Sequence, residues 1–388
     1  MRDVFVEVHD FGFGPACGFL DITEPFATAY RWHVLAAGNA AAYIRQERPG
    51  IDVIPFDGFN RDNWPKLHTI VPPDAPLVSL SHPGFAAYAA QHGYNVCLVD
   101  QLDWMWDANP AGIDEVYLHL VQYYFGKSSA KARAENAIEI RPIVTPLVPV
   151  RQRAKGAFGT VVGLGGMAIA GNPAGGDAYA KWVLPHILSA LEDTPEAFPV
   201  CVVGGSPNLP SIVGALGDDR VSPYVGVTRS VYMRMLQGSS FQILTPGLAS
   251  IYEAAVVGFS PFFQPGVNKS MLLQVHSLSA TGYPFTMLWP WFEAVQPELK
   301  SLAAADALAM IKNHIATSIG GEDNSGEILE TAIRSYVLHR DHKPLPIYLP
   351  AALPDGSMLL EQALERLCMA NSVNASVITP KENARGAG

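Results

Sequence analysis

Residues 241–265 read FQILTPGLASIYEAAVVGFSPFFQP. The first four, apolar except for Gln242, are typical of a buried strand, and Thr245-Pro246-Gly247 follow as a turn. The next residues have the pattern of a helix, which Ser250 is placed to cap or open. A strand that feeds a helix through a glycine turn is one unit of a parallel α/β sheet.

Similar units occur on both sides of this stretch. The expected strands of the first half are Val4–Val8, Trp32–Ala36, Ile51–Pro55, Leu77–Leu80 and Asn95–Val99. Those of the second half are Gly159–Leu164, Phe198–Val203, Phe241–Leu244 and Phe259–Phe263. The runs are rich in apolar residues rather than strictly alternating, which favours sheets covered on both faces. We therefore expect an α/β fold with two parallel sheets, and a ligand cleft between them.

Residues 128–156 differ in character, because basic side chains fall there among Pro142, Pro146 and Pro149. We interpret this segment as the crossing between two domains; a surface excursion inside one domain is the alternative. The predicted domains are residues 1–150 and 151–340. A C-terminal extension, 341–388, is expected to hold a helix over Met358–Met369 and a disordered tail.

Composition excludes several classes of protein. The 388 residues carry 26 basic and 36 acidic side chains, so the formal net charge is −10. This acidity argues against nucleic-acid partners and against a basic patch on an anionic membrane. No apolar run reaches the length of a membrane span, and the charged start MRDVFVEVHD does not resemble a signal peptide. The four cysteines have no metal or redox spacing, so we expect a cytoplasmic protein.

The turn and helix after Thr245 are suited to a diphosphate. The amides of Gly247, Ala249 and Ser250 and the positive end of the helix can bind an anion. Glu253 lies three residues after Ser250 on the same helix face, where its carboxylate can accept two hydrogen bonds from a ribose diol. A capping box between Ser250 and Glu253 uses the same spacing and is the alternative.

Gly247, Ser250, Glu253-Ala254, Gly258-x-x-Pro261 and Gln274 together resemble the nucleotide-sugar motif of GT-B glycosyltransferases. Pro261 comes one residue later than in the commoner Gly-x-Pro. The resemblance implies two Rossmann-like domains facing a cleft, the first binding an acceptor and the second a nucleotide-sugar donor. Its implied donor-binding residues are Gly165, Gly166, Gly205, Ser206, Gly247, Ala249, Ser250, Glu253, Asn268 and Gln274.

A dinucleotide fingerprint is the competing interpretation of Gly163-Leu164-Gly165-Gly166. The last glycine of that fingerprint is replaced by Ala168, and Gly204 stands where a ribose-binding acid would end the next strand. A nicotinamide enzyme is therefore disfavoured.

His9 and Asp10 end the first predicted strand, before a glycine-rich loop. In similar glycosyltransferases a histidine of this loop deprotonates the acceptor hydroxyl, a role that suits neutral imidazole. Asp10 could be the base instead, or could orient His9. A histidine that only satisfies a hydrogen bond at the strand end is the structural alternative.

Another polar stretch follows the strand that ends at Val99. It places three carboxylates beside two tryptophans, which suits a hydroxylated or ring-bearing acceptor. The expected acceptor-binding residues are Asp103, Trp104 and Trp106, with His82 at another strand-to-helix junction. Paired aspartates are also compatible with a metal or a glycosidase dyad, and the tryptophans with packing between domains.

The resemblance implies transfer of a sugar from a nucleotide diphosphate sugar to a small soluble acceptor. We expect the transfer to invert the anomeric carbon, because the attack is in line, and to be metal-independent, because the diphosphate is stabilised by backbone amides and the helix dipole. No bound cofactor is expected, because the nucleotide sugar is a co-substrate. A nucleotide-sugar 2-epimerase of the same fold is the alternative, with Asp100, Asp103 and His82 as acid–base candidates. A non-catalytic relative that binds a partner protein is the third possibility, and the oligomeric state is open.

Overall fold

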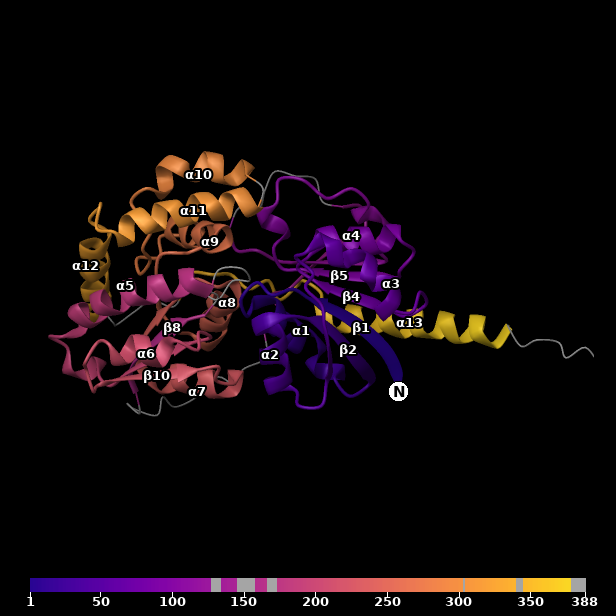
Figure 1. Cartoon of the computed structure of the whole chain (residues 1–388), viewed down its shortest axis with the longest axis horizontal. Helices are drawn as coiled ribbons and strands as arrows, with labels where there is room; N and C mark the ends of the chain where they lie inside the picture. Colours follow the sequence, from indigo (N-terminus) through magenta and orange to yellow (C-terminus); the bar gives the residue numbers. More distant parts are fainter. Residues whose placement is uncertain (127–133, 145–157, 166–172, 303, 340–344, 378–388) are drawn as a thin grey trace, which may run out of the picture.

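The computed structural model describes residues 1–126, 134–144, 158–165, 173–302, 304–339 and 345–377. Two parallel sheets form two halves that lie side by side (Figure 1). The first sheet has the strand order β3-β2-β1-β4-β5-β6-β7, and the second has the order β10-β9-β8-β11-β12. The predicted α/β architecture with two parallel sheets is therefore confirmed.

The strands of the first sheet are β1 (Arg2–Val8), β2 (Tyr30–Ala36), β3 (Asp52–Pro55), β4 (Leu77–Leu80), β5 (Val96–Asp100), β6 (Leu118–Gln122) and β7 (Ala137–Ile140). Those of the second are β8 (Phe158–Leu164), β9 (Val200–Gly204), β10 (Val221–Val225), β11 (Ser239–Leu244) and β12 (Phe262–Phe263). β7 lies inside the predicted crossing, where it extends the first sheet. The rest of that crossing falls largely outside the described residues.

The helices of the first half are α1 (Gly14–Thr23), α2 (Gly38–Glu47), α3 (Leu67–Ile70) and α4 (Pro83–Gln91). Those that follow are α5 (Pro173–Leu191), α6 (Leu209–Gly214), α7 (Arg229–Gly238), α8 (Leu248–Val257), α9 (Lys269–Ala280), α10 (Phe292–Ser301), α11 (Ala304–Ile319), α12 (Ser325–Leu338) and α13 (Gly356–Val377). Short 3-10 helices connect some of them, including η3 (Asp103–Met105).

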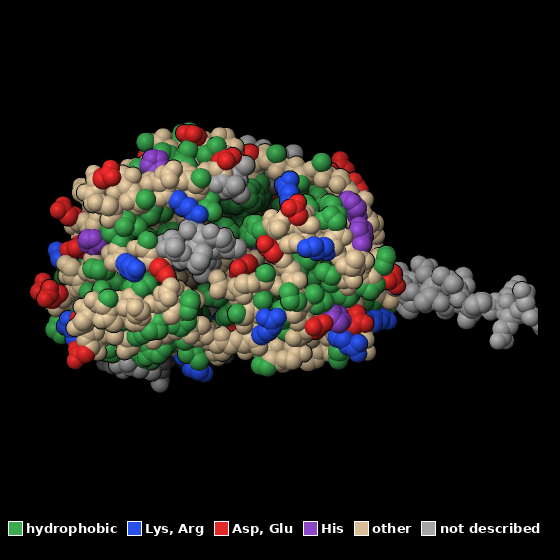
Figure 2. Space-filling view, in the orientation of Figure 1, with side chains coloured by type: hydrophobic (Ala, Val, Ile, Leu, Met, Phe, Trp, Pro, Cys, Tyr) green, Lys and Arg blue, Asp and Glu red, His purple; other side chains and the backbone are tan. Residues whose placement is uncertain are grey.

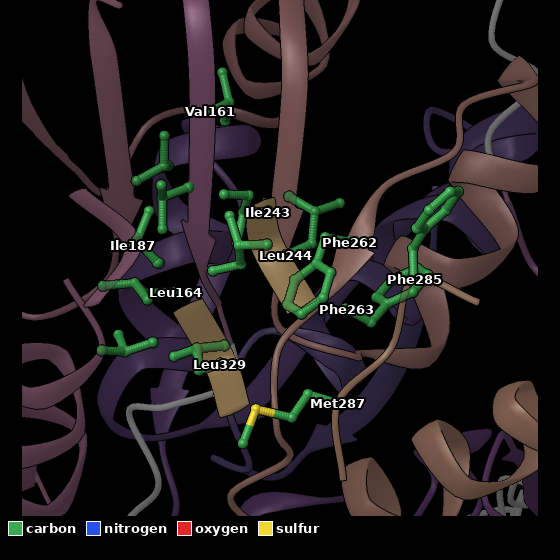
Figure 3. Packing of buried hydrophobic residues seen from close by; sticks show 14 of the residues in the cluster. Val161, Leu164, Ile187, Ile243, Leu244, Phe262, Phe263, Phe285, Met287 and Leu329 are labelled. Atoms are coloured by element: carbon green, nitrogen blue, oxygen red, sulfur yellow. The ribbon is translucent and has the colours of Figure 1, made fainter. Parts of the chain in front are cut away.

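Both faces of the first sheet are covered by apolar clusters. Along β1, Val4, Val6 and Val8 belong to one cluster and Phe5 to another, because successive side chains point to opposite faces. In the second half, Val161, Ile243 and Phe262 of the sheet belong to the same cluster as Ile187 of α5 and Leu329 of α12 (Figure 3). This packing explains the apolar strands of the sequence.

The C-terminal helix α13 packs against the first half, although it follows the second half in the chain (Figure 1). Leu360, Leu364 and Leu367 belong to the apolar cluster that contains Val4, Val6 and Val8 of β1. The helix expected over Met358–Met369 lies within α13, and the tail from residue 378 is outside the described residues.

Candidate functional site

A cavity lies between the two halves, and both contribute to its wall. The first half supplies apolar and aromatic side chains such as Phe11, Phe13 and Tyr43, together with Gln101 after β5. The second half supplies the residues that follow β8 and β11 and one side of α9. Figure 2 shows one face of the molecule, hollowed between the halves, with Lys and Arg scattered rather than gathered in a patch.

The start of α8 forms part of the cavity wall. The helix begins at Leu248 with Gly247 as its N-cap residue, so Ser250 does not cap the helix but lies in its first turn. Within the described chain, no side chain caps this end. The Thr245 hydroxyl donates to the Gly165 carbonyl at 2.6 Å and ties this turn to the loop after β8. The first turn of α8 lines the cavity, and the backbone amides of a helix start have no partners within the helix, as an anion site requires.

Glu253 lies one turn further along α8 and is 6% exposed. Its Oε1 accepts a hydrogen bond from Arg229 Nη2 at 2.6 Å, so the capping box with Ser250 is wrong. Burial raises the pKa of Glu253 to about 7, although the nearby Arg229 cation opposes the shift. Glu253 is therefore close to its protonation midpoint at neutral pH.

Arg229 begins α7 and joins the two halves. Its guanidinium pairs with Asp21 of α1 as well as with Glu253, and its backbone amide donates to Glu47 Oε1 at 2.6 Å. Thr228 precedes it as the cap of α7. The sequence did not single out Arg229, because both of its acidic partners are distant in the chain.

Asn268 and Gln274 line the cavity from α9. Asn268 caps the helix, because its Oδ1 accepts from the Met271 amide at 2.9 Å. Gln274 is 2% exposed, and its Oε1 has no hydrogen-bond partner among the described residues. A buried acceptor of this kind is expected to meet a donor group that enters the cavity.

Two other predicted donor-binding residues lie in a separate hollow. Gly205 and Ser206 line it, and the Ser206 hydroxyl donates to Asp177 Oδ1 at 2.6 Å. A Cβ on Gly205 would lie 2.6 Å from Phe13 Cζ, so glycine permits close packing against the first half. Gly165 and Ala249 do line the main cavity, whereas Gly166 lies outside the described residues.

His9 and Asp10 do not line the main cavity. Asp10 Oδ1 accepts a hydrogen bond from the Ala40 amide at 3.1 Å and so holds the start of α2. Burial raises the pKa of Asp10. His9 is buried, and its Nδ1 has no hydrogen-bond partner in the described part of the chain. Burial, and then the nearby His82, lower the pKa of His9 to about 4. His9 is therefore neutral at physiological pH.

His9 belongs to a compact group with Glu7 and His82. One ring nitrogen of each histidine and one carboxylate oxygen of Glu7 lie within 4.8 Å of one another. Glu7 Oε1 lies 2.9 Å from His82 Nδ1, and Glu7 Oε2 accepts the Ser79 hydroxyl at 2.9 Å. Ser81, between the strand and His82, lines the cavity and has a left-handed φ of 54°. Glu7 was missed because it occupies an otherwise apolar strand.

The predicted acceptor-binding residues Asp103, Trp104 and Trp106 also do not line the cavity, whereas Gln101 and Leu102 do. Trp104 stacks on Tyr124 with ring centroids 3.8 Å apart, and both belong to the apolar cluster of the second half. Trp106 packs against the same cluster, which favours the alternative in which these tryptophans pack between domains.

No protein-family model and no curated protein matches the chain. Among solved structures, it is similar to the Methanocaldococcus jannaschii UDP-GlcNAc 2-epimerase in complex with UDP-GlcNAc and UDP. The two are 7% identical over 94% of this chain and 100% of that one, with a TM-score of 0.52. The chain has the GT-B fold. The structural similarity establishes the fold, but a sequence identity this low establishes nothing about activity.

Two further structures resemble the chain less in shape. One is the spinosyn rhamnosyltransferase SpnG, with 13% identity, coverage of 93% of this chain and 99% of that chain, and a TM-score of 0.49. The other is MurG of Acinetobacter baumannii, with 11% identity, coverage of 94% and 100%, and a TM-score of 0.45.

The cavity of this GT-B chain lies where parallel sheets usually bind ligands, beyond the carboxyl ends of their strands. Gly165 follows β8, Thr245 follows β11 and Gln101 follows β5. Among the described helices, none is both long and apolar enough to cross a membrane.

Proposed function

We propose that the protein transfers a sugar from a nucleotide diphosphate sugar to a small, diffusible acceptor. One observation carries this proposal: a single cavity is lined by the start of α8, the buried carboxylate of Glu253 and a Gln274 carbonyl that has no partner among the described residues. Each matches one part of such a donor. The helix start suits the diphosphate, Glu253 suits the ribose diol, and Gln274 suits a sugar hydroxyl.

The charges of the cavity wall agree with this assignment. Arg229 is the only Lys or Arg among the described lining residues, and its guanidinium is already paired with Glu253 and Asp21. Backbone amides and the dipole of α8 would therefore stabilise the diphosphate as it leaves with its additional negative charge. Glu253 keeps its second oxygen for the ribose while Oε1 accepts from Arg229.

In the proposed transfer, the acceptor oxygen attacks the anomeric carbon as the bond to the diphosphate breaks. The hydroxyl proton is assigned to His9, as the resemblance implies; because His9 does not line the cavity, this step requires its ring to become accessible to the bound acceptor. Glu7 beside His9 favours its cationic form, and His82 favours its neutral form. An in-line attack of this kind inverts the anomeric carbon. Asp10 has a positioning role here, because its carboxylate holds the start of α2.

A binding panel followed by a product search tests this function. Nucleoside diphosphates and their sugars are screened by thermal shift, and the best donor is then incubated with candidate acceptors under mass spectrometry. We expect at least one nucleotide diphosphate to raise Tm and one glycoside to form. If no nucleotide diphosphate raises Tm, the proposal is refuted and a non-catalytic relative that binds a partner protein is favoured.

A nucleotide-sugar 2-epimerase is the second candidate. The acid–base group of Glu7, His9 and His82 favours it, although none of these three side chains lines the cavity. Asp100 and Asp103, the carboxylates expected from the sequence, do not line the cavity. UDP-N-acetylglucosamine is incubated without an acceptor and followed by NMR. Inversion at C2 would favour the epimerase, whereas donor binding without inversion favours transfer.

A further inference from the structure

A second group of ionisable side chains lies at the carboxyl end of β5, outside the cavity wall. Asp100 is 1% exposed, Asp103 5% and His119 of β6 1%. One ligand atom of each lies within 4.8 Å of those of the other two. Two carboxylates and one imidazole thus converge in the interior of the first half.

Several atoms of this group have no hydrogen-bond partner among the described residues. Asp100 Oδ1 accepts the Leu102 amide at 2.8 Å, but Asp100 Oδ2 has no partner. Both ring nitrogens of His119 lack one too. His119 Nε2 lies 3.9 Å from Asp100 Oδ2, which is too long for a hydrogen bond. Buried atoms left in this way point to a species that the protein groups themselves do not supply.

We propose that Asp100, Asp103 and His119 bind a divalent cation of the first transition row, with Zn²⁺ or Mn²⁺ as the probe. Metal–ligand bonds of this class are about 2.0–2.2 Å, so two ligands on a tetrahedral ion are about 3.4 Å apart. The gap of 3.9 Å between Asp100 and His119 needs only a small closure to reach that spacing. Two carboxylates balance the charge of the ion, and the imidazole favours a transition metal over Mg²⁺ or Ca²⁺.

The ion would position the wall of the cavity. Its ligands come from the end of β5, from η3 and from β6, so it would join the segment Gln101–Leu102 to the sheet. Gln101 and Leu102 line the cavity, but the three ligands do not. The ion therefore stands apart from the reacting centre, and this site does not depend on the proposed transfer.

Metal content tests the site without any assay of activity. Tag-free protein is stripped with a chelator, equilibrated separately with Zn²⁺ and Mn²⁺, and analysed by mass spectrometry of the metal. We expect about one ion per chain and a higher Tm with the ion, because a ligand of the folded state stabilises it. Asp100→Asn and His119→Gln should each weaken binding by at least about 100-fold, since removing a group that only orients a metal ligand already costs about 10–100-fold.

His33→Gln is the matched control. His33 lies at the surface between Asp3 and Asp52, with both ring nitrogens hydrogen-bonded at 2.9 and 2.7 Å. This variant should bind the ion as the wild type does. Substoichiometric binding of both metals by the wild type would overturn the proposal, as would full binding by His119→Gln or loss of binding in the control.

If the buried variants do not fold, X-ray absorption on the wild-type zinc complex replaces them. One imidazole nitrogen with oxygen ligands is expected. Sulfur, or more than one imidazole, would place the ion elsewhere and refute the site.

Discussion

Glu253 offers the sharpest test of the donor site. Glu253→Ala removes the acceptor that we assign to the ribose diol, and Glu253→Gln keeps the shape but removes the charge. Hydrogen bonds to a charged group contribute about 1.5–3 kcal/mol, and 1.4 kcal/mol corresponds to a factor of ten. Glu253→Ala should therefore raise the donor Kd about 10- to 150-fold. Arg229 retains Asp21 in both variants, so the fold should survive.

The pH dependence follows from the surroundings of the same group. Because burial raises the pKa of Glu253 to about 7, the free protein holds a proton there in acid. Donor affinity should then weaken as the pH falls below about 7, and this dependence should vanish in Glu253→Gln. A nucleotide sugar is the correct probe, since a terminal phosphate would itself titrate near pH 6.

Isothermal titration calorimetry at pH 8 and pH 6 measures both effects. Glu298→Ala is the control, because Glu298 is an exposed glutamate of α10 in the same half. A folded Glu253→Ala that binds the donor as tightly as the wild type would refute the ribose assignment. An unchanged pH dependence in Glu253→Gln would show that another group titrates.

Three further changes probe the contacts around the cavity. Gly205→Ala places a methyl group against Phe13, so calorimetry should show that the free energy of unfolding falls by about 1–3 kcal/mol. Adding Phe13→Ala to this variant should restore the lost stability, and no recovery would contradict the contact. Gln274→Leu should raise the KM of the nucleotide sugar without changing the affinity for the nucleoside diphosphate, and an unchanged KM would argue against a sugar contact. The pKa of His9 is lowered to about 4 from 6.5, so wild-type stability should fall as pH falls through that range. Urea unfolding should show a smaller fall in His9→Gln, and equal falls would contradict its burial as a neutral group.

Much of the fold could be predicted because its signals are local. β1 and β11 appear as apolar runs, and each precedes a glycine-containing turn and a helix. β6 was not predicted, because His119 and Gln122 interrupt its apolar pattern although both are buried. β7 was missed for another reason, since it lies in the segment whose prolines and basic residues suggested a crossing.

The cavity wall around α8 could be predicted in part. Gly247, Glu253 and Gln274 lie on neighbouring elements, so their spacing along the chain carries over to their spacing in the cavity. Arg229 and Glu7 act through partners on distant elements, and no spacing encodes such a pair. The tryptophans beside carboxylates suggested residues that line an acceptor site. Composition alone does not distinguish residues that line a cavity from residues that pack in the protein interior.

The acidity of the chain and an anionic ligand are compatible because they act over different distances. Arg229, the cation of the described cavity wall, is balanced by Glu253 and Asp21. The positive field at the start of α8 arises from aligned peptide dipoles and acts within about one turn. Exposed surface charges are screened beyond about 8 Å at physiological salt and oppose that field little. The net charge thus argues against nucleic acids and anionic membranes as partners, while the proposed diphosphate site relies on the backbone of one helix.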